Sequence, residues 1–134
     1  MRIGISHITL IVRDIERTAR LFERVFDASR LYESGARQFS ISQETFLSVG
    51  GIWLCLMAGE PHAARTYDHI AFSLTDDQFD RCVERLTAYA VEMRPDRPRV
   101  AGEGRSAYFY DYDNHLFELH VGTLEERLAR YHSD

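Results

Sequence analysis

The sequence of 134 residues contains no lysine, has only two cysteines and three prolines, and includes no long apolar run. Its apolar stretches fall far short of the roughly 20 residues that a membrane-spanning helix needs, so we expect no membrane partner. The net charge is −5, from 21 acidic against 16 basic residues. This balance lacks the basic footprint of nucleic-acid-binding proteins, so we expect no nucleic-acid partner. Two cysteines cannot build a disulfide framework, which favours the reducing cytoplasm.

Because lysine is absent, all 16 basic residues are arginines. Any anion that a side-chain cation holds in this protein is therefore held by a planar guanidinium group, which donates two parallel hydrogen bonds to phosphate-like groups. The length fits one unit of ordinary domain size. A hydrophobic content of 45% with only eight glycines indicates a globular chain rather than a disordered one.

The chain contains an internal repeat. A shift of 62 residues aligns SHITLIVRDIERTARLFERVF with DHIAFSLTDDQFDRCVERLTA, so that His7 falls on His69 and Asp14 on Asp76. Each Asp stands at a position typical of a helix N-cap and is followed by apolar residues at helical spacing. We interpret this similarity as a duplicated strand–helix unit.

Short extended segments follow each predicted helix. Gly50-Gly51 between two apolar runs is typical of a hairpin. The predicted strands are 38–42, 45–49 and 52–57 in the first half, and 106–111 and 115–121 in the second.

These patterns predict an α+β fold of two paired βαβββ modules with a short C-terminal helix. The predicted boundaries are module 1 at about 1–58, a linker at 59–66, module 2 at 67–121 and a closing helix at 123–132. A half of about 60 residues is a marginal core by itself, so we expect the two modules to form a single domain over 1–134.

Two histidines at equivalent strand positions suggest a metal site, and Glu118 supplies a matching carboxylate. Its neighbours are apolar, and a buried Glu is costly unless it is paired, protonated or bound to a cation. Glu118 lies 49 residues after His69, and the same spacing after His7 reaches Leu56, which cannot bind a metal. Three protein ligands, His7, His69 and Glu118, with one position left open are typical of a catalytic site. This ligand set suits Mn(II), Fe(II) or Zn(II).

The remaining histidines and the cysteine in the fourth predicted strand have simpler interpretations. His120 shares the strand face of Glu118 and is a competing ligand. His62, His115 and His132 are expected to be solvated, and Cys55 to be buried filler in a strand.

The paired modules and the motif D-x-D-N-H-x-x-E, from Asp111 to Glu118, resemble the vicinal oxygen chelate superfamily, which includes glyoxalase I, extradiol dioxygenases and fosfomycin resistance proteins. The similarity to the fosfomycin resistance group is closer and covers nearly the whole chain. Its blocks are SHITLIVRD near the start, IWLCLM at 52–57, YDHIAF at 67–72 and EGRSAYFYDYDNHLFELHVGTLEERL at 103–128. The stretch GEGRS, the stretch RPDRPRV at 94–100 and a Glu before the third strand, Glu44, are similar to the epoxide hydrolase type of that group.

The resemblance implies a Mn(II)-dependent hydrolase that confers resistance to the antibiotic fosfomycin, a small epoxide carrying a phosphonate. Water would add to the carbon that bears phosphorus and give a diol, with Glu44 as general base. The resemblance also implies Mn(II) bound by His7, His69 and Glu118 in a homodimer. Each site would take His7 from one chain and the other two ligands from its partner.

The same resemblance assigns contacts to the substrate. Tyr67, Ser106, Tyr108 and Arg127 match phosphonate contacts of the group, and Trp53 is expected to line the pocket wall with Phe46. Thr9 shares the strand face of His7 and would contact the epoxide end. The lysine that holds the phosphonate in the glutathione-dependent type is absent here, so Arg94 or Arg99 is expected to replace it. These two belong to four arginines around the Gly102–Gly104 loop: Arg94, Arg97, Arg99 and Arg105.

Three alternatives accompany this interpretation. A thiol transferase would open the same epoxide with glutathione or another thiol, and it needs no base for water, so Glu44 disfavours it. An extradiol dioxygenase uses two His and a carboxylate for Fe(II), but the shared sequence blocks disfavour it. A non-catalytic drug-binding dimer is disfavoured because all three metal ligands are present.

Overall fold

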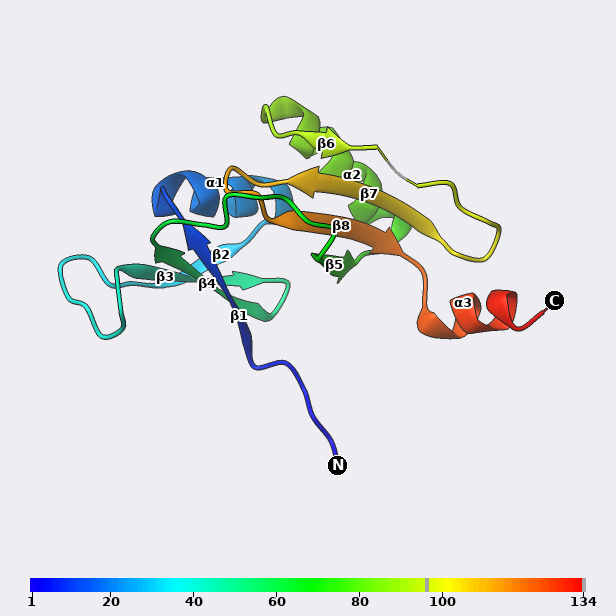
Figure 1. Cartoon of the computed structure of the whole chain (residues 1–134), viewed down its shortest axis with the longest axis horizontal. Coiled ribbons are helices and arrows are strands. Elements are labelled where there is room, and N and C mark those ends of the chain that lie inside the picture. Colours follow the sequence, from blue (N-terminus) through cyan, green and yellow to red (C-terminus); the bar gives the residue numbers. More distant parts are fainter. Residues whose placement is uncertain (96, 134) are drawn as a thin grey trace. The chain divides into compact units, whose positions relative to one another are not determined.

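The computed structural model describes residues 1–95 and 97–133, which form two compact units, Met1–Ala63 and Ala64–Asp134 (Figure 1). The first unit forms a four-stranded sheet in the order β1-β4-β3-β2, in which β1 is parallel to β4 and the other pairs are antiparallel. Its elements are β1 (His7–Val12), α1 (Ile15–Phe26), β2 (Ser29–Glu33), β3 (Glu44–Val49) and β4 (Ile52–Ala58).

The second unit repeats this topology, with the sheet order β5-β8-β7-β6 and β5 parallel to β8. Its elements are β5 (His69–Ser73), α2 (Asp76–Ala88), β6 (Met93–Arg94), β7 (Arg105–Tyr110), β8 (Leu116–Val121) and α3 (Leu124–Tyr131). The α+β class, the βαβββ modules and the short C-terminal helix are therefore confirmed. In the described part of the chain, no helix has the length and apolarity to cross a membrane.

One of the two predicted helix N-caps is confirmed and the other is wrong. Asp14 caps α1, because its Oδ1 accepts a hydrogen bond from the Arg17 N–H at 3.0 Å. Asp76 does not cap α2, and this prediction is wrong. Thr75 is the N-cap and forms a capping box with Gln78, whose side chain accepts from the Thr75 N–H at 3.0 Å. Asp76 is instead the first helical residue, where its charge favours the positive end of the helix dipole.

Two edge strands differ from the prediction. Residues 38–42 form no strand, whereas β2 at Ser29–Glu33 and the two-residue β6 were not predicted. The strand β2 is a short segment of mixed polarity, in which Arg30 binds three glutamates, Glu16, Glu23 and Glu33, at 2.7 to 2.8 Å. Its sequence has no clear strand pattern, and its pairing with β3 makes it a strand.

Each sheet has one apolar face covered by its helix. In the first unit, Leu47, Leu54 and Leu56 are buried on this face, and α1 packs on β3 and β4 with Leu21, Phe22 and Val25. In the second unit, buried Phe72, Phe109, Phe117 and Leu119 occupy the corresponding face, and α2 contacts β8. Burying each of these side chains stabilises the fold by about 1.5–3 kcal/mol. Because strand residues alternate, the residues between them point to the opposite face, which carries the candidate site.

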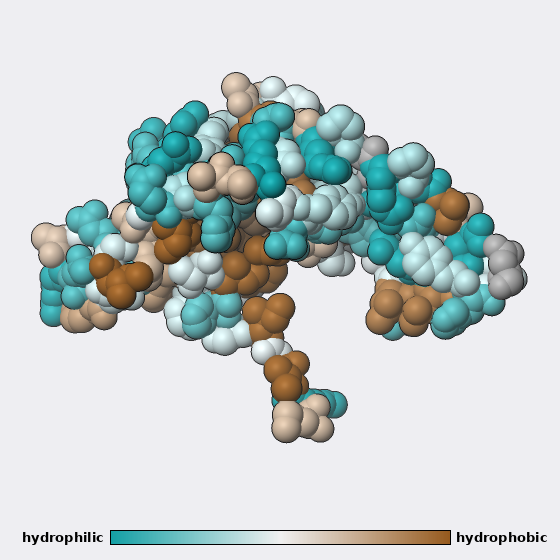
Figure 2. Space-filling view, in the orientation of Figure 1, coloured by the Kyte–Doolittle hydropathy of each residue, from teal (hydrophilic) through white to brown (hydrophobic). Residues whose placement is uncertain are grey.

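Some apolar surface stays outside these cores. The N-terminal segment before β1 carries the exposed side chains of Ile3 and Ile5, and brown apolar atoms are visible along this segment in Figure 2. The helix α3 buries none of its residues, and Leu124, Leu128 and Tyr131 are exposed on it.

Candidate metal and substrate site

In the second unit, the strand register gathers the predicted site residues on the face away from α2. Glu118 on β8 pairs with Ala71 on one side and with Tyr108 on the other. Two residues further along, His120 pairs with Ser106, and two residues before, Leu116 pairs with His69. All of these side chains alternate onto the same face as Glu118.

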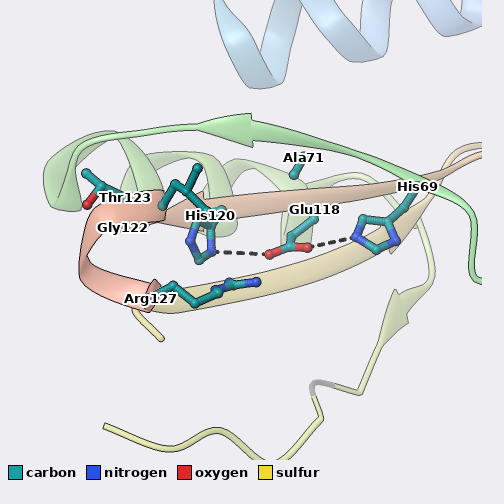
Figure 3. Close-up of a pocket in the computed structure, with 8 residues that line it drawn as sticks. His69, Ala71, Glu118, His120, Gly122, Thr123 and Arg127 are labelled. Carbon is teal, nitrogen blue, oxygen red and sulfur yellow. Dashed lines mark ion pairs between the residues drawn. The ribbon is translucent and has the colours of Figure 1, made fainter. Parts of the chain in front are cut away.

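Glu118 is the centre of this cluster and is buried, with 5% of its surface exposed. Its Oε1 lies 3.0 Å from His69 Nε2, and its Oε2 accepts a hydrogen bond from the Ser106 hydroxyl at 2.6 Å. His120 Nδ1 lies 3.2 Å from Oε2, so that Glu118 stands between the two histidines (Figure 3). Burial acts to raise the pKa of Glu118. Hydrogen bonds from Ser106 and Tyr108, together with the nearby histidines, outweigh burial and hold the pKa below its ordinary value.

The pair His69–Glu118 fits a divalent metal ion. His69 Nδ1 lies 2.6 Å from the Tyr67 carbonyl oxygen, and because a carbonyl only accepts, Nδ1 carries the proton. The other ring nitrogen, Nε2, faces Glu118 Oε1 at 3.0 Å, so that both atoms can coordinate one divalent cation. The Nδ1–H bond to a carbonyl is the usual second contact of a metal-binding His.

The structure brings together two of the three predicted ligands. In the described residues, no group of three or more His, Cys, Asp or Glu side chains is arranged to hold a metal. The third predicted ligand, His7, lies on β1 in the first unit.

A pocket of about 300 Å³ opens beside this cluster. Its lining residues are His69, Ala71, Glu118, His120, Gly122, Thr123, Leu124 and Arg127. The Arg127 side chain extends from α3 alongside Glu118 and His120 (Figure 3). Gly104 makes the close approach of two backbones under this pocket possible, because a Cβ at this position would lie 2.0 Å from the Val121 carbonyl oxygen.

Arg94 and Arg99 both reach the cluster, in different ways. Arg99 Nη2 donates to the Tyr108 hydroxyl at 2.9 Å and lies 3.6 Å from Glu118 Oε2, and its side chain is only 11% exposed. Arg94 lies over the Tyr67 ring, 4.7 Å from the ring centroid.

The Tyr67 and Tyr108 hydroxyls are 3.1 Å apart. Burial raises the pKa of Tyr108, and the hydrogen bond with Tyr67 and the charge of Glu118 act in the same direction. The Tyr108 hydroxyl therefore stays protonated at neutral pH and remains a hydrogen-bond donor.

The other two arginines around the glycine loop have structural partners. Arg97 Nη2 donates to Glu103 Oε2 at 2.5 Å. Arg105 binds Asp76 at 2.8 Å and Asp80 at 2.6 Å, both on α2. These ion pairs distinguish Arg97 and Arg105 from Arg94 and Arg99, which lie at the site.

The first unit presents a second cluster on the face away from α1. The His7 ring lies 4.3 Å from the Trp53 ring, and Phe46 lies 5.1 Å from Trp53 on the other side. Thr9 pairs with Cys55 in the neighbouring strand. The predicted residues His7, Thr9 and Trp53 therefore share one surface.

Glu44 belongs to this same face and is buried as the first residue of β3, not solvated in a loop. Its backbone N–H donates to the Ser34 hydroxyl at 3.0 Å, which holds the start of the strand. Its carboxylate Oε2 accepts a hydrogen bond from the Cys55 thiol at 3.7 Å. Hydrogen bonds therefore fix the Glu44 carboxylate on the sheet face that also carries His7 and Thr9, and this geometry is suited to proton transfer.

Two sequence-based interpretations are wrong. Leu56 is not the counterpart of Glu118, because His7 pairs with Trp53 whereas His69 pairs with Leu116, and this pairing makes Cys55 the counterpart. Leu56 lies on the helix-covered face and is fully buried, since one residue of offset turns a side chain to the other face of a strand.

His115 is also not solvated. Its Nδ1 lies 2.7 Å from the buried carboxylate of Asp111. His62 and His132 are exposed, as predicted. The proximity of Cys55 to Glu44 was missed, because only the pairing of β3 with β4 brings residues 44 and 55 together.

Comparison with known proteins places these observations in a family. The model of the Glyoxalase/Bleomycin resistance protein/Dioxygenase superfamily matches residues 4–119. Fosfomycin resistance protein FosX from Mesorhizobium japonicum is 58% identical over 127 residues, which cover 95% of this chain and 91% of that protein. FosX from Listeria innocua is 55% identical over 129 residues, covering 96% and 97%.

A solved structure gives the same result. A variant of FosX from Listeria monocytogenes, complexed with Mn(II) and 1S,2S-dihydroxypropylphosphonic acid, superposes with a TM-score of 0.88 at 52% identity, covering 98% of this chain and all of that one. Sequence identity above 50% over nearly the full length, together with the same fold, assigns the chain to a family. The chain belongs to the glyoxalase/bleomycin resistance/dioxygenase superfamily and, within it, to the FosX fosfomycin resistance proteins.

Proposed function

We propose that this protein is a Mn(II)-dependent epoxide hydrolase that inactivates fosfomycin and thereby confers resistance to it. The observation that carries the proposal is the related FosX structure that holds Mn(II) and a dihydroxypropylphosphonic acid. That compound is the vicinal diol that results when water opens the epoxide of fosfomycin. The residues that we assign to the reaction lie on the two sheet faces described above, in the loop that carries Arg99 and on α3.

Mn(II) would be held by His69 and Glu118 of one protomer and by His7 of a second protomer. When bound, the ion supplies Lewis-acid stabilisation to the epoxide oxygen as the ring opens. His69 is already oriented for this role by its Nδ1–H bond to the Tyr67 carbonyl. Ser106 in turn orients Glu118.

The phosphonate would bind between Arg99, Tyr108, Ser106 and Arg127, with Tyr67 and Arg94 at its edge. We favour Arg99 over Arg94 as the replacement for the family lysine. The Arg99 guanidinium is mostly buried and lies beside Tyr108 and Glu118, whereas Arg94 packs over the Tyr67 ring. A buried guanidinium binds a phosphonate more strongly than an exposed one, because the local dielectric constant is lower.

Water would attack the phosphorus-bearing carbon with Glu44 as general base. The water oxygen forms a bond to this carbon while the bond from carbon to the epoxide oxygen breaks. One proton of the water passes to Glu44, which later returns it to solvent, and the ring-opened oxygen takes up a proton from solvent to complete the diol. Thr9, on the same face, would donate to the epoxide end, and Trp53 would close the wall of the pocket. A positioned general base contributes about 10² to 10⁴ in rate.

A homodimer in the cytoplasm is the expected setting. In the ligand set that we propose, His7 comes from a second copy of the chain, and apolar side chains such as Ile3, Ile5 and Leu124 are exposed in the single chain. Both features support the association of two copies. Cys55 and Cys82 are both buried and form no disulfide with each other, which supports a reducing compartment.

Phosphorus NMR of fosfomycin with the purified protein and Mn(II), with and without glutathione, tests the proposal. We expect the diol in both samples, loss of diol formation after removal of the metal by a chelator, and a rate at least about 100-fold lower in Glu44→Gln. The matched control is Glu60→Gln, which removes an exposed carboxylate and leaves the rate unchanged.

Other outcomes would contradict the proposal. An adduct that forms only with glutathione would identify a thiol transferase and leave Glu44 without a role as base. An unchanged phosphorus spectrum combined with binding of the drug would identify a drug-binding dimer.

A further inference from the structure

Cys55 lies at the centre of the functional face of the first unit. It sits on β4, between Thr9 on β1 and Phe46 on β3, and 3% of its surface is exposed. Its sulfur lies 3.7 Å from Glu44 Oε2, one diagonal step across the strand pair. The thiol is therefore enclosed next to the carboxylate that we assign as the base.

The hydrogen bond runs from the thiol to the carboxylate. Burial, and after it the negative charge of Glu44, raises the pKa of the Cys55 thiol to about 11, against a smaller opposite effect of Thr9. The sulfur is therefore protonated at neutral pH and is a donor, although a weak one. The ionised carboxylate of Glu44 can only accept. Burial and protonation together make Cys55 a poor nucleophile.

The second unit contains the same diagonal contact with the roles exchanged. There, the Ser106 hydroxyl on β7 donates to Glu118 on β8 at 2.6 Å. By strand register, Ser106 is the counterpart of Glu44, and Glu118 is the counterpart of Cys55. In both units, then, a small donor and a carboxylate occupy the same two positions, and the donor holds one carboxylate oxygen.

We propose that Cys55 is a positioning residue for the general base Glu44. Its thiol holds Oε2, so that the carboxylate has a defined rotamer and Oε1 is directed toward the attacking water. This role rests on the proposed hydrolase function, and it assigns to Cys55 no contact with the substrate. The thiol acts through Glu44 in the transition state, so it affects kcat and leaves the binding of fosfomycin unchanged.

A double-mutant cycle tests this role. We expect Cys55→Ala to lower kcat by about 5- to 10-fold, the effect of one hydrogen bond, with KM for fosfomycin unchanged. Cys55→Ser keeps a donor and should stay within about twofold of the wild type, as should the control Cys82→Ala, a buried cysteine on α2. In a Glu44→Gln background, Cys55→Ala should lower kcat no further, because the base it positions is gone.

A second measurement needs neither metal nor activity. In metal-free Cys82→Ala protein, the infrared S–H stretching band reports Cys55 alone, and we expect it to move to higher frequency in Glu44→Ala because the thiol loses its acceptor. An unchanged band would overturn the contact.

Equal losses of kcat in both Glu44 backgrounds would overturn the positioning role, because they would show that Cys55 acts through the fold. Absence of diol with the wild-type enzyme would overturn the proposed function itself. This outcome is distinct from the one that overturns only the positioning role, in which the wild type forms the diol and the kcat losses of Cys55→Ala and Glu44→Gln add in the double variant.

Discussion

The two units share one topology but carry different chemistry on their open faces. In the second unit, the inner strand β8 presents Glu118, surrounded by His69, His120 and Arg99. In the first unit, the inner strand β4 presents Cys55 at the same position, and the carboxylate is that of Glu44 on the neighbouring strand β3. The fold thus supplies equivalent positions, and the residue type at each position decides which chemistry that position can support.

The neighbouring groups also interact more strongly with the Glu118 carboxylate than with the Glu44 carboxylate. Glu118 accepts a short hydrogen bond of 2.6 Å from a hydroxyl and lies beside imidazole and guanidinium groups, which stabilise its charged form. Glu44 accepts from a thiol at 3.7 Å, which is a weak donor. A carboxylate whose charged form is strongly stabilised is a good metal ligand, which suits Glu118 to the role that we propose for it.

The largest expected effect tests the register on which this comparison depends. Leu56→Ala should lower the free energy of unfolding by about 2–5 kcal/mol, because Leu56 is fully buried against α1. If Leu56 faced the site instead, the same substitution would lower kcat and leave stability nearly intact. Urea unfolding and the rate of diol formation by phosphorus NMR measure both quantities, and the variant Cys55→Ala shows the effect expected of a residue that does face the site.

A smaller effect separates the two diagonal contacts. Ser106→Ala removes the donor that orients Glu118, and we expect Mn(II) affinity to fall about 10- to 100-fold. Cys55→Ala removes the equivalent contact in the first unit and should leave Mn(II) affinity unchanged. The control is Ser73→Ala, an exposed serine on the same face of the second sheet. Equal Mn(II) affinities in the Ser106→Ala and wild-type proteins would contradict the role of Ser106.

The smallest effect concerns the loop that carries Arg99. Glu103 binds Arg97, the Val100 N–H at 2.9 Å and the Tyr131 hydroxyl at 2.7 Å, which links the loop to α3. Arg97 is the main cause that holds the pKa of Glu103 well below its ordinary value, and Val100 and Tyr131 act in the same direction.

A carboxyl whose pKa is lower in the folded state stabilises that state above its ordinary pKa. The stabilisation is lost as the pH falls from that value toward the lowered one. We therefore expect Glu103→Gln to lower Tm by a few degrees at neutral pH. The difference from the wild type should shrink below about pH 4.5, as seen by thermal unfolding. A Tm difference that is constant with pH would show that the charge of Glu103 is not involved.

Much of the fold was predictable because it depends on local patterns. The repeat of His7 and His69, the alternation of the strands and the helical spacing after Asp14 all follow from short-range rules of strand and helix geometry. The edge strand β2 was not predictable, because its five residues are of mixed polarity and its structure depends on pairing with β3.

The site was predictable in part for the same reason. Glu118 stands out in the sequence because a carboxylate among apolar strand residues needs a partner. The hydrogen bond between Cys55 and Glu44 could not be predicted from the sequence, because the two residues are adjacent only through the pairing of β3 with β4.

The sequence by itself determined the duplicated α+β modules and the exclusive use of arginine as the side-chain cation. The tertiary structure alone decided which arginines face the site, since Arg97 and Arg105 are paired elsewhere and Arg99 is buried beside Glu118. It also decided that Cys55 rather than Leu56 is the counterpart of Glu118. The physical reason is that side chains alternate along a strand, so a register that differs by one residue changes the face on which each side chain lies.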